Sequence, residues 1–138
     1  MTDSVAAYVR DSIARPPFHH WLRPEIIEAD ATSGRVVIAL PLRPEFRRDP
    51  DRPEIHGGVI AALVDIAGHT AVAAKLRHGV PTVDLRIDYL RMAAGTELRA
   101  TAEPIKMGRA LGLVDVQVTD DQGKLIAVGR GVFSTRAG

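Results

Sequence analysis

One carboxylate interrupts the longest apolar stretch of the chain. Residues 55–74, IHGGVIAALVDIAGHTAVAA, are mostly apolar residues and glycine, and Asp65 lies in their middle. An ionised carboxylate in apolar surroundings is costly unless it is paired or hydrogen-bonded. Asp65 is therefore either a satisfied structural residue or a group that does chemistry, such as accepting a proton from water as a general base.

Two glycines follow a histidine at the start of the same stretch. Gly57 and Gly58 permit a tight entry into a helix, because glycine allows close approach of the backbone. Free amide groups at a helix N-terminus can also point at an oxyanion that develops during a reaction. The two interpretations are compatible. His56 either anchors this turn through its ring or acts directly as a donor near a leaving group.

The spacing of these groups has a geometric consequence. Gly57 and Asp65 are eight residues apart, which is about 12 Å along a helix axis. One carbonyl group cannot contact the Gly57 amide and Asp65 of the same chain. If both act on one substrate, two chains must supply them, as in a symmetric dimer. Small residues would let two such helices approach closely: Ala61, Ala62, Ala67, Ala71 and Ala73.

A second titratable residue lies one helical turn after the carboxylate. His69 is on the same helix face as Asp65. It can pair with Asp65, or it can be an interior histidine whose ring is hydrogen-bonded elsewhere, and we favour the interior histidine. No further ligand falls at helical spacing, so we expect no metal site.

The composition is that of one folded domain. The 138 residues can bury a core but are too few for two ordinary domains. A net charge of +1 gives no sign of binding to nucleic acid or membranes, and the lack of cysteine suits the cytoplasm. Acidic residues stand where a signal peptide would be basic, and Asp65 and His69 argue against a membrane span. We therefore predict a single cytoplasmic domain over residues 1–138.

The first half of the chain predicts a hairpin followed by a long buried helix. Helical spacing of apolar residues indicates a helix at about residues 3–14, which Pro16 and Pro17 end. The charged, proline-containing segment 43–54 reads as a loop. Unbroken apolar character predicts the long helix near residues 57–76. The hairpin has a strand near Ile26, a turn at Ser33–Gly34 and a strand over 35–40, and the segment 78–81, with Gly79 and Pro81, ends the long helix.

The remainder predicts an antiparallel sheet. In TVDLRIDYL, residues 82–90, apolar and charged residues alternate with a period of two, which a helix cannot use. Turns at Ala94–Gly95, Gly108–Arg109 and 120–123 divide the rest into further strands. The sequence therefore predicts an α+β fold, in which the apolar helix covers one face of a meander of about four strands.

Several of these motifs together resemble one family. His56, Gly57 and Gly58, followed by Ala61, Leu63 and Asp65, resemble the hotdog-fold thioesterases of the phenylacetate-degradation (PaaI-like) type. The resemblance continues in PTVDLRIDYLRMA, residues 81–93, and GKLIAVGRGVF, residues 123–133. It covers roughly residues 20–133 and implies a long central helix wrapped by a curved antiparallel sheet.

The resemblance implies hydrolysis of acyl-CoA thioesters carrying a small or medium acyl or an aryl group. It assigns Asp65 as general base or nucleophile, the Gly57 amide as oxyanion donor, and the Thr82 hydroxyl as a group that assists the water. Coenzyme A is then part of the substrate and no cofactor is expected. The expected assembly is a homodimer or a dimer of dimers, which is a homotetramer, without nucleic-acid or membrane partners.

Substrate contacts are predicted from charge and position. Coenzyme A is polyanionic and needs local basic residues. Gly58 and His69 lie beside the expected catalytic residues. The basic candidates near strand ends and turns are Arg86, Arg91, Lys106 and Arg109.

One position departs from the family pattern. Many relatives carry an asparagine six residues before the histidine of the motif, whereas this chain has Pro50 there and no asparagine at all. Asp49 or Arg52 could replace that amide. The departure keeps open a non-catalytic acyl-CoA binding module, and an Asp65–His69 pair would instead indicate a hotdog dehydratase or hydratase.

Overall fold

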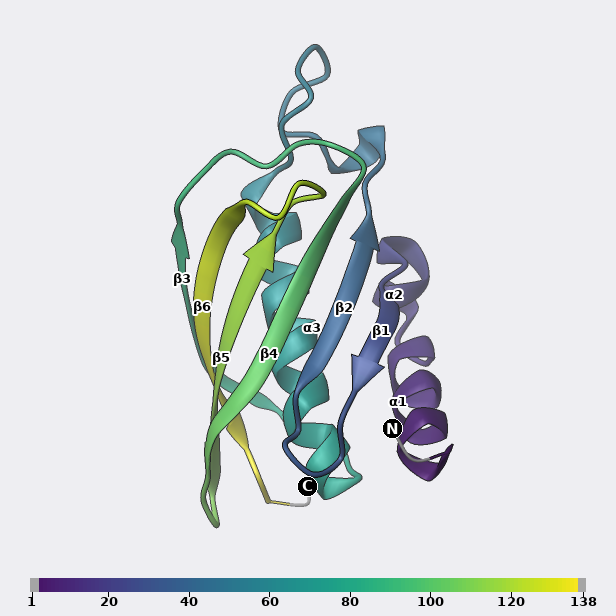
Figure 1. The fold of residues 1–138 in the computed structure, drawn as a ribbon, viewed down its shortest axis with the longest axis vertical. Helices are drawn as coiled ribbons and strands as arrows, with labels where there is room; N and C mark the ends of the chain where they lie inside the picture. The colour runs from purple at the N-terminus through teal and green to yellow at the C-terminus, as the bar shows by residue number, and fades with distance from the viewer. Residues whose placement is uncertain (1–2, 137–138) are drawn as a thin grey trace.

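A curved sheet wraps around one long helix. The computed structural model describes residues 3–136, in which α3, Gly57–Leu76, runs along the concave face of a six-stranded antiparallel sheet (Figure 1). This confirms the predicted helix and the strands that follow it. The strands are β1, Glu25–Ala29; β2, Val36–Pro41; β3, Thr82–Tyr89; β4, Glu97–Met107; β5, Leu111–Thr119; and β6, Leu125–Ser134.

The strand order differs from a simple meander. It is β1-β2-β4-β5-β6-β3, so β1 and β2 form the predicted hairpin and β4, β5 and β6 are joined by two more, whereas β3 does not pair with β4. The chain after β3 crosses the end of the sheet before it enters β4 (Figure 1). As a result β3 pairs with β6 rather than with its sequence neighbour β4, and it forms one edge of the sheet. Alternation in the sequence reports strands and faces, but not which neighbour a strand joins.

The helix α3 forms the centre of the core. It has the length and apolar character of a membrane span, yet 67% of its most apolar window is buried inside this fold. A helix that is apolar on nearly all sides belongs in such an interior. It ends at Arg77, whose left-handed backbone (φ 62°) lets its N–H bond to Ala73 O. The predicted end near residue 76 is thus confirmed, although the residue with the left-handed backbone is Arg77 and not a glycine of the segment 78–81.

Two short elements were not predicted. The helix α1, Asp3–Ala14, lies where a helix was predicted, and it is followed by the first unpredicted element, a six-residue helix α2, Pro17–Leu22, which begins at a proline. Proline is tolerated at the first helical position because that N–H has no intrahelical partner. The segment expected to be only a loop contains a 3-10 turn, η1, Pro44–Phe46, and Phe46 is fully buried.

Glycines set the distance between α3 and the sheet. A Cβ atom on Gly68 of α3 would lie 2.8 Å from the ring of Phe133 on β6. A Cβ on Gly131, two residues before Phe133, would lie 2.5 Å from the same ring. The fully buried Phe133 ring therefore fills a space that exists only because both positions lack a side chain.

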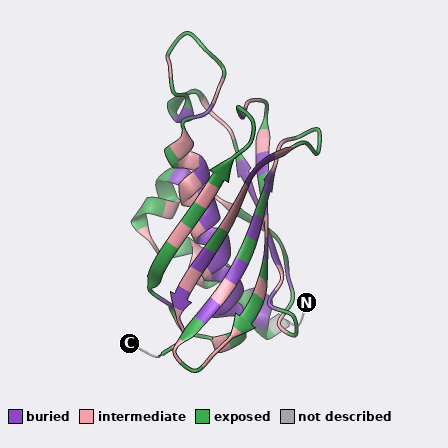
Figure 2. Cartoon of the chain, turned by 90° about the vertical axis from the view of Figure 1, so that its left-hand side faces the viewer, coloured by how far each residue is buried: buried purple, intermediate pink, exposed green. Residues whose placement is uncertain are grey.

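The edge strand β3 is the least covered part of the sheet. Buried residues recur along β4 and β5 and fill most of β2, whereas β3 has no fully buried residue (Figure 2). Leu85 and Ile87 are half-buried, but Val83 is 58% exposed and Tyr89 is 51% exposed. Half of the apolar face predicted for this strand thus remains uncovered in a single chain.

Candidate active site

A carboxylate–hydroxyl pair joins the central helix to the edge strand. Thr82, the first residue of β3, donates from Oγ1 to Oδ1 of Asp65 over 2.7 Å. Asp65 is half-buried, and among residues 3–136 no basic side chain forms an ion pair with it. The structure therefore brings together the two polar side chains that the sequence had placed on different elements.

The N-terminus of α3 presents one unused amide. His56 caps the helix, because its Nδ1 accepts from Gly58 N over 2.8 Å and its carbonyl accepts from Val59 N over 3.0 Å. Within the described part of the chain, the Gly57 N–H has no acceptor. The amide predicted as an oxyanion donor is therefore free. His56 makes the bracing contact, and with Nδ1 accepting, its ring proton is assigned to Nε2.

A tyrosine that the sequence did not single out holds this end of the helix. The Tyr89 hydroxyl donates to Gly57 O over 2.8 Å. Its ring lies 3.4 Å from the position that a Cβ on Gly57 would occupy. The alternating pattern put Tyr89 on the helix side of β3. Its place beside Gly57 depends on how far β3 extends along α3, which no local pattern reveals.

His69 is an interior histidine whose partner is a backbone carbonyl. Its Nδ1 lies 3.0 Å from Val80 O, and its ring packs edge-on against Phe133. Burial lowers the pKa of His69, while the hydrogen bond to Val80 and the charge of Asp65 raise it and the nearby His19 lowers it. In the described residues no hydrogen bond joins His69 to Asp65, so the histidine–carboxylate pair that would indicate a dehydratase is not formed.

The four basic candidates do not gather at this site. Arg86 projects from β3 and pairs with Asp88 over 3.4 Å, and Arg91 donates to Leu125 O over 3.0 Å. Lys106 and Arg109 are exposed near the hairpin between β4 and β5. This hairpin is at the opposite end of the sheet from the loop that carries Arg91 (Figure 1). A phosphate role for any of them stays a prediction.

The segment around Pro50 extends away from the body of the fold. Arg47 and Ile55 form a bridge at its base, and the loop between them projects at the end of the molecule that holds the start of α3 (Figure 1). Asp49 Oδ1 accepts from Asp51 N over 2.8 Å, and Arg52 is exposed. Neither side chain is hydrogen-bonded to Asp65 within this chain, so their suggested role as a replacement for asparagine stays a prediction.

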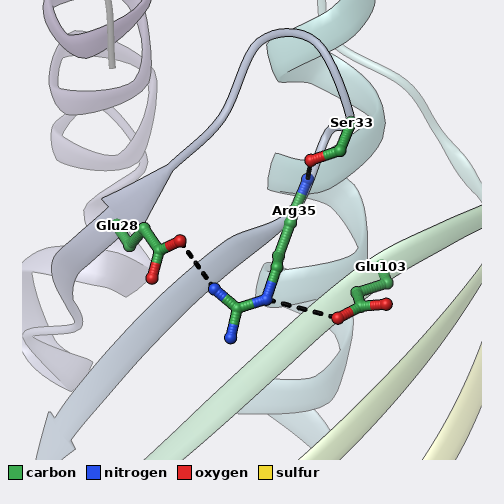
Figure 3. Close-up of polar contacts among 4 residues, drawn as sticks. All are labelled: Glu28, Ser33, Arg35 and Glu103. Carbon is green, nitrogen blue, oxygen red and sulfur yellow. Dashed lines mark hydrogen bonds and ion pairs between the residues drawn. The ribbon is translucent and has the colours of Figure 1, made fainter.

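The outer face of the sheet carries most of the paired charges. Arg35 bonds to Glu28 over 2.6 Å and to Glu103 over 3.2 Å, and its N–H bonds to Ser33 (Figure 3). On β5 and β6, Asp115 accepts two bonds from Arg130, at 2.8 and 3.1 Å. A hollow of about 390 Å³ is lined by Asp115, Arg130 and Arg86. Its charged side chains already pair with one another, as Arg130 with Asp115 and Arg86 with Asp88, and its lining does not include Asp65.

A second cavity adjoins the start of α3. It has a volume of about 310 Å³ and lies between α2, η1 and the first turns of α3. His56 and Gly58 line it together with apolar side chains, among them Trp21, Phe46, Val59 and Ala62. This cavity, unlike the outer hollow, therefore borders the helix end that carries the free Gly57 amide.

Comparison with known proteins identifies the family. Residues 54–127, more than half of the chain, match the family described as the thioesterase superfamily. The chain belongs to the thioesterase superfamily. A superfamily protein of known structure superimposes with a TM-score of 0.90 at 34% identity, covering 97% of this chain and 100% of that one. The predicted α+β hotdog fold is thereby confirmed.

Other relatives of this thioesterase-superfamily chain are more distant. A protein of Halobacterium salinarum that carries an esterase designation is 33% identical over 115 residues, covering 75% of this chain and 76% of the relative. The medium/long-chain acyl-CoA thioesterase YigI of Escherichia coli is 32% identical over 88 residues, covering 53% of this chain and 57% of its own length. The Escherichia coli PaaI protein from the phenylacetic acid degradation operon shares the fold, with a TM-score of 0.85 at 24% identity, covering 97% of this chain and 94% of that one.

Proposed function

We propose that this chain is an acyl-CoA thioester hydrolase in which Asp65 and Gly57 do the chemistry. The observation that carries the proposal is the half-buried Asp65 carboxylate, which is held by the Thr82 hydroxyl and has no cationic partner in residues 3–136. A carboxylate placed in this way can accept a proton from water or attack an acyl carbon itself. Membership of the thioesterase superfamily and the name of the YigI relative support thioesters of coenzyme A as substrates.

The reaction follows from the two groups. The thioester carbonyl oxygen lies at the free Gly57 N–H, which stabilises the negative charge that develops there. In the general-base route, water attacks the carbonyl carbon as Asp65 takes its proton. The C–S bond then breaks, the fatty or aryl acid leaves with the new oxygen, and the coenzyme A thiolate receives the proton. In the nucleophilic route an Asp65 oxygen attacks the carbonyl carbon, the C–S bond breaks and the coenzyme A thiolate leaves. Water then hydrolyses the resulting anhydride, which releases the acid, regenerates the Asp65 carboxylate and supplies the proton that the thiolate takes up. Thr82 orients the carboxylate in both routes.

The site is completed by a second copy of the chain. Gly57 and Asp65 lie at the start and in the middle of α3, about 12 Å apart along its axis, so one carbonyl cannot reach both. The edge strand β3 carries exposed apolar side chains and an unpaired backbone edge, which a partner would cover. We therefore propose a homodimer, or a dimer of dimers, with Gly57 of one chain facing Asp65 of the other.

A thiol-release assay over short, medium, long and aryl acyl-CoAs tests the proposed activity. We expect release for at least one class and loss of release in Asp65→Asn. The replacement of the usual asparagine by Pro50 favours one other function, a non-catalytic acyl-CoA binding module. That function predicts saturable acyl-CoA binding without thiol release from any substrate, which would refute the hydrolase proposal.

Complementation of two inactive variants tests the shared site. Gly57→Pro removes the proposed N–H donor, and proline suits this first helical position, where the preceding His56 is already extended (ψ 135°). Mixing Gly57→Pro with Asp65→Asn forms heterodimers with one intact site each, so random exchange should restore about a quarter of native activity. A site within one chain predicts no recovery. A chain that remains monomeric by sedimentation while active would also refute the proposal.

A further inference from the structure

The cavity beside α3 borders the two residues on either side of Gly57, the proposed oxyanion donor. It borders Gly58, whose neighbour Gly57 carries the free N–H, and then follows Val59 and Ala62 along the first two turns of the helix. A thioester carbonyl at Gly57 has its sulfur on one side and its acyl chain on the other. Apart from Glu45, Arg47 and His56, the cavity is lined by apolar side chains and Gly58, and the acyl chain can extend into it from the carbonyl.

Aromatic rings form the wall opposite α3. The Trp21 ring meets the fully buried Phe46 edge-on at 5.3 Å between centroids, and Phe18 stacks on Trp21 at 6.3 Å. Phe18 and Trp21 are about half exposed, although large aromatic side chains gain from burial. The wall thus offers aromatic surface that an apolar group in the cavity would cover.

Arg43 fixes this wall. Its guanidinium lies 4.1 Å from the Phe46 ring centroid and 4.8 Å from that of Trp21, and it bonds to the backbone carbonyls of Trp21 and Leu22. A six-residue helix such as α2 has little stability of its own. The Arg43 contacts therefore hold α2 in place, so that Trp21 is a defined boundary of the cavity.

The volume sets the size of the occupant. A closed apolar cavity of about 150 Å³ accommodates benzene, and this cavity, which is open on one side, has a volume of about 310 Å³ and so has room for a somewhat larger group. We propose that it binds the acyl part of the thioester, a compact apolar group of the size of an octanoyl chain or a phenylacetyl group, and that Trp21 is the residue that limits its length. This inference rests on the proposed function for the position of the carbonyl.

Trp21 reports directly on the cavity because it is the only tryptophan in the chain. We would titrate the Asp65→Asn protein with octanoyl-CoA, phenylacetyl-CoA, acetyl-CoA and free coenzyme A, and follow tryptophan fluorescence. The first two ligands should change the emission saturably, and the last two should not. Comparison of the octanoyl and phenylacetyl responses tells a linear from an aryl occupant. An equal response to all four ligands, or no response to either large acyl group, would overturn the proposal.

Variants of Trp21 in the aromatic wall and of Ala62 on the α3 side of the cavity test the length limit by turnover. Trp21→Ala should raise kcat/KM for dodecanoyl-CoA relative to octanoyl-CoA at least ~10-fold, and Ala62→Leu should lower kcat/KM for octanoyl-CoA relative to acetyl-CoA by a similar factor. Ratios measured on one preparation do not depend on the folded fraction. The matched control is Ile27→Ala on β1, which is 47% exposed, compared with 49% for Trp21. If Trp21→Ala behaves like this control, Trp21 does not limit the acyl length.

The two proposals fail in different ways. If no acyl-CoA is hydrolysed but Trp21 fluorescence still discriminates octanoyl-CoA from acetyl-CoA, the hydrolase proposal is wrong and the acyl cavity stands. If acyl-CoA is hydrolysed but neither Trp21→Ala nor Ala62→Leu changes the kcat/KM ratios between acyl lengths, the hydrolase proposal stands and the acyl group binds elsewhere.

Discussion

The carboxylates on the two faces of the sheet have different partners. On the outer face, Glu28 and Glu103 bond to Arg35, and Asp115 bonds twice to Arg130. On the helix side, Asp65 accepts one bond from the neutral Thr82 hydroxyl. The outer carboxylates thus have their charge balanced by a neighbouring guanidinium, whereas Asp65 has no such neighbour in residues 3–136.

This difference separates a structural role from a chemical one. Exposed ion pairs add little to stability because water and salt screen them. The outer carboxylates therefore organise surface charge and have little influence on the fold. A half-buried carboxylate without a cation is expensive to keep, and its cost is explained if Asp65 must exchange a proton or attack a carbon atom.

The strongest test of the comparison replaces one carboxylate on each side of the sheet by the corresponding amide. Asp65→Asn keeps the size of the side chain but removes the base and nucleophile, so turnover should fall at least ~10²-fold. Folding and assembly should survive, with equal or higher stability. The matched control is Asp115→Asn, which should change salt-dependent stability slightly and leave turnover unchanged. Turnover and melting temperature, measured on one preparation, distinguish a chemical from a structural role of Asp65. Near-native turnover of Asp65→Asn would make Asp65 a structural carboxylate.

The hydroxyl partner should have a smaller effect. Thr82→Val removes the hydrogen bond to Asp65 while keeping the shape of the side chain, and a bond to a charged group is worth about 1.5–3 kcal/mol. We expect kcat to fall about 10-fold or more. Thr82→Ser, which restores the hydroxyl, should recover most of that loss. Equal kcat values for the valine and serine variants would show that Thr82 does not position the carboxylate.

Tyr89 tests the other end of the site. Tyr89→Phe keeps the ring against Gly57 but removes the hydroxyl that bonds to Gly57 O. A neutral hydrogen bond contributes about 0.5–1.5 kcal/mol, so we expect a few-fold loss of kcat with little change in KM. Tyr8→Phe on α1 is the control and should leave kcat unchanged. A loss of Tm without any change of kcat would limit Tyr89 to a structural role.

The smallest effect concerns pH. Burial lowers the pKa of His69 in the folded state, whereas in the unfolded chain it is about 6.5. Near and below pH 6.5 the unfolded state binds the proton more readily than the folded state does. The free energy of unfolding should therefore decrease as the pH falls from about 6.5 towards the lower pKa of the folded state. His69→Gln should flatten this dependence, and His20→Gln on the surface should not. Denaturant unfolding at a series of pH values provides the measurement, and equal slopes for the native protein and His69→Gln would contradict it.

The sequence predicted the parts of the fold and site that depend on local pattern. The unbroken apolar run indicated α3, and the alternation after Pro81 indicated strands, because each periodicity suits one backbone geometry. Asp65, His56 and Gly57 were singled out because they are unusual residues in or at the start of an apolar helix, and their roles in catalysis stay predictions. Thr82 came from the family resemblance, and the structure adds the hydrogen bond that joins it to Asp65.

The missed features depend on tertiary approach. Phe46 lies in a segment rich in charge and proline, yet it is fully buried because η1 folds back under α2. Trp21 and Tyr89 lie near the start of α3 only because α2 and β3 reach that end of the helix. The pairing of β3 with β6 likewise follows from a crossing connection. The periodicity of apolar residues within one segment does not predict these tertiary contacts.

The packing of Phe133 constrains how this protein can change over evolution. Gly68 and Gly131 both make room for its ring, and Gly68 lies less than one helical turn after Asp65. A side chain at either glycine would push α3 away from β6 and shift Asp65 relative to Thr82, unless Phe133 became smaller at the same time. The three positions should therefore vary together among relatives, and a transplanted active site would need all three to keep its spacing.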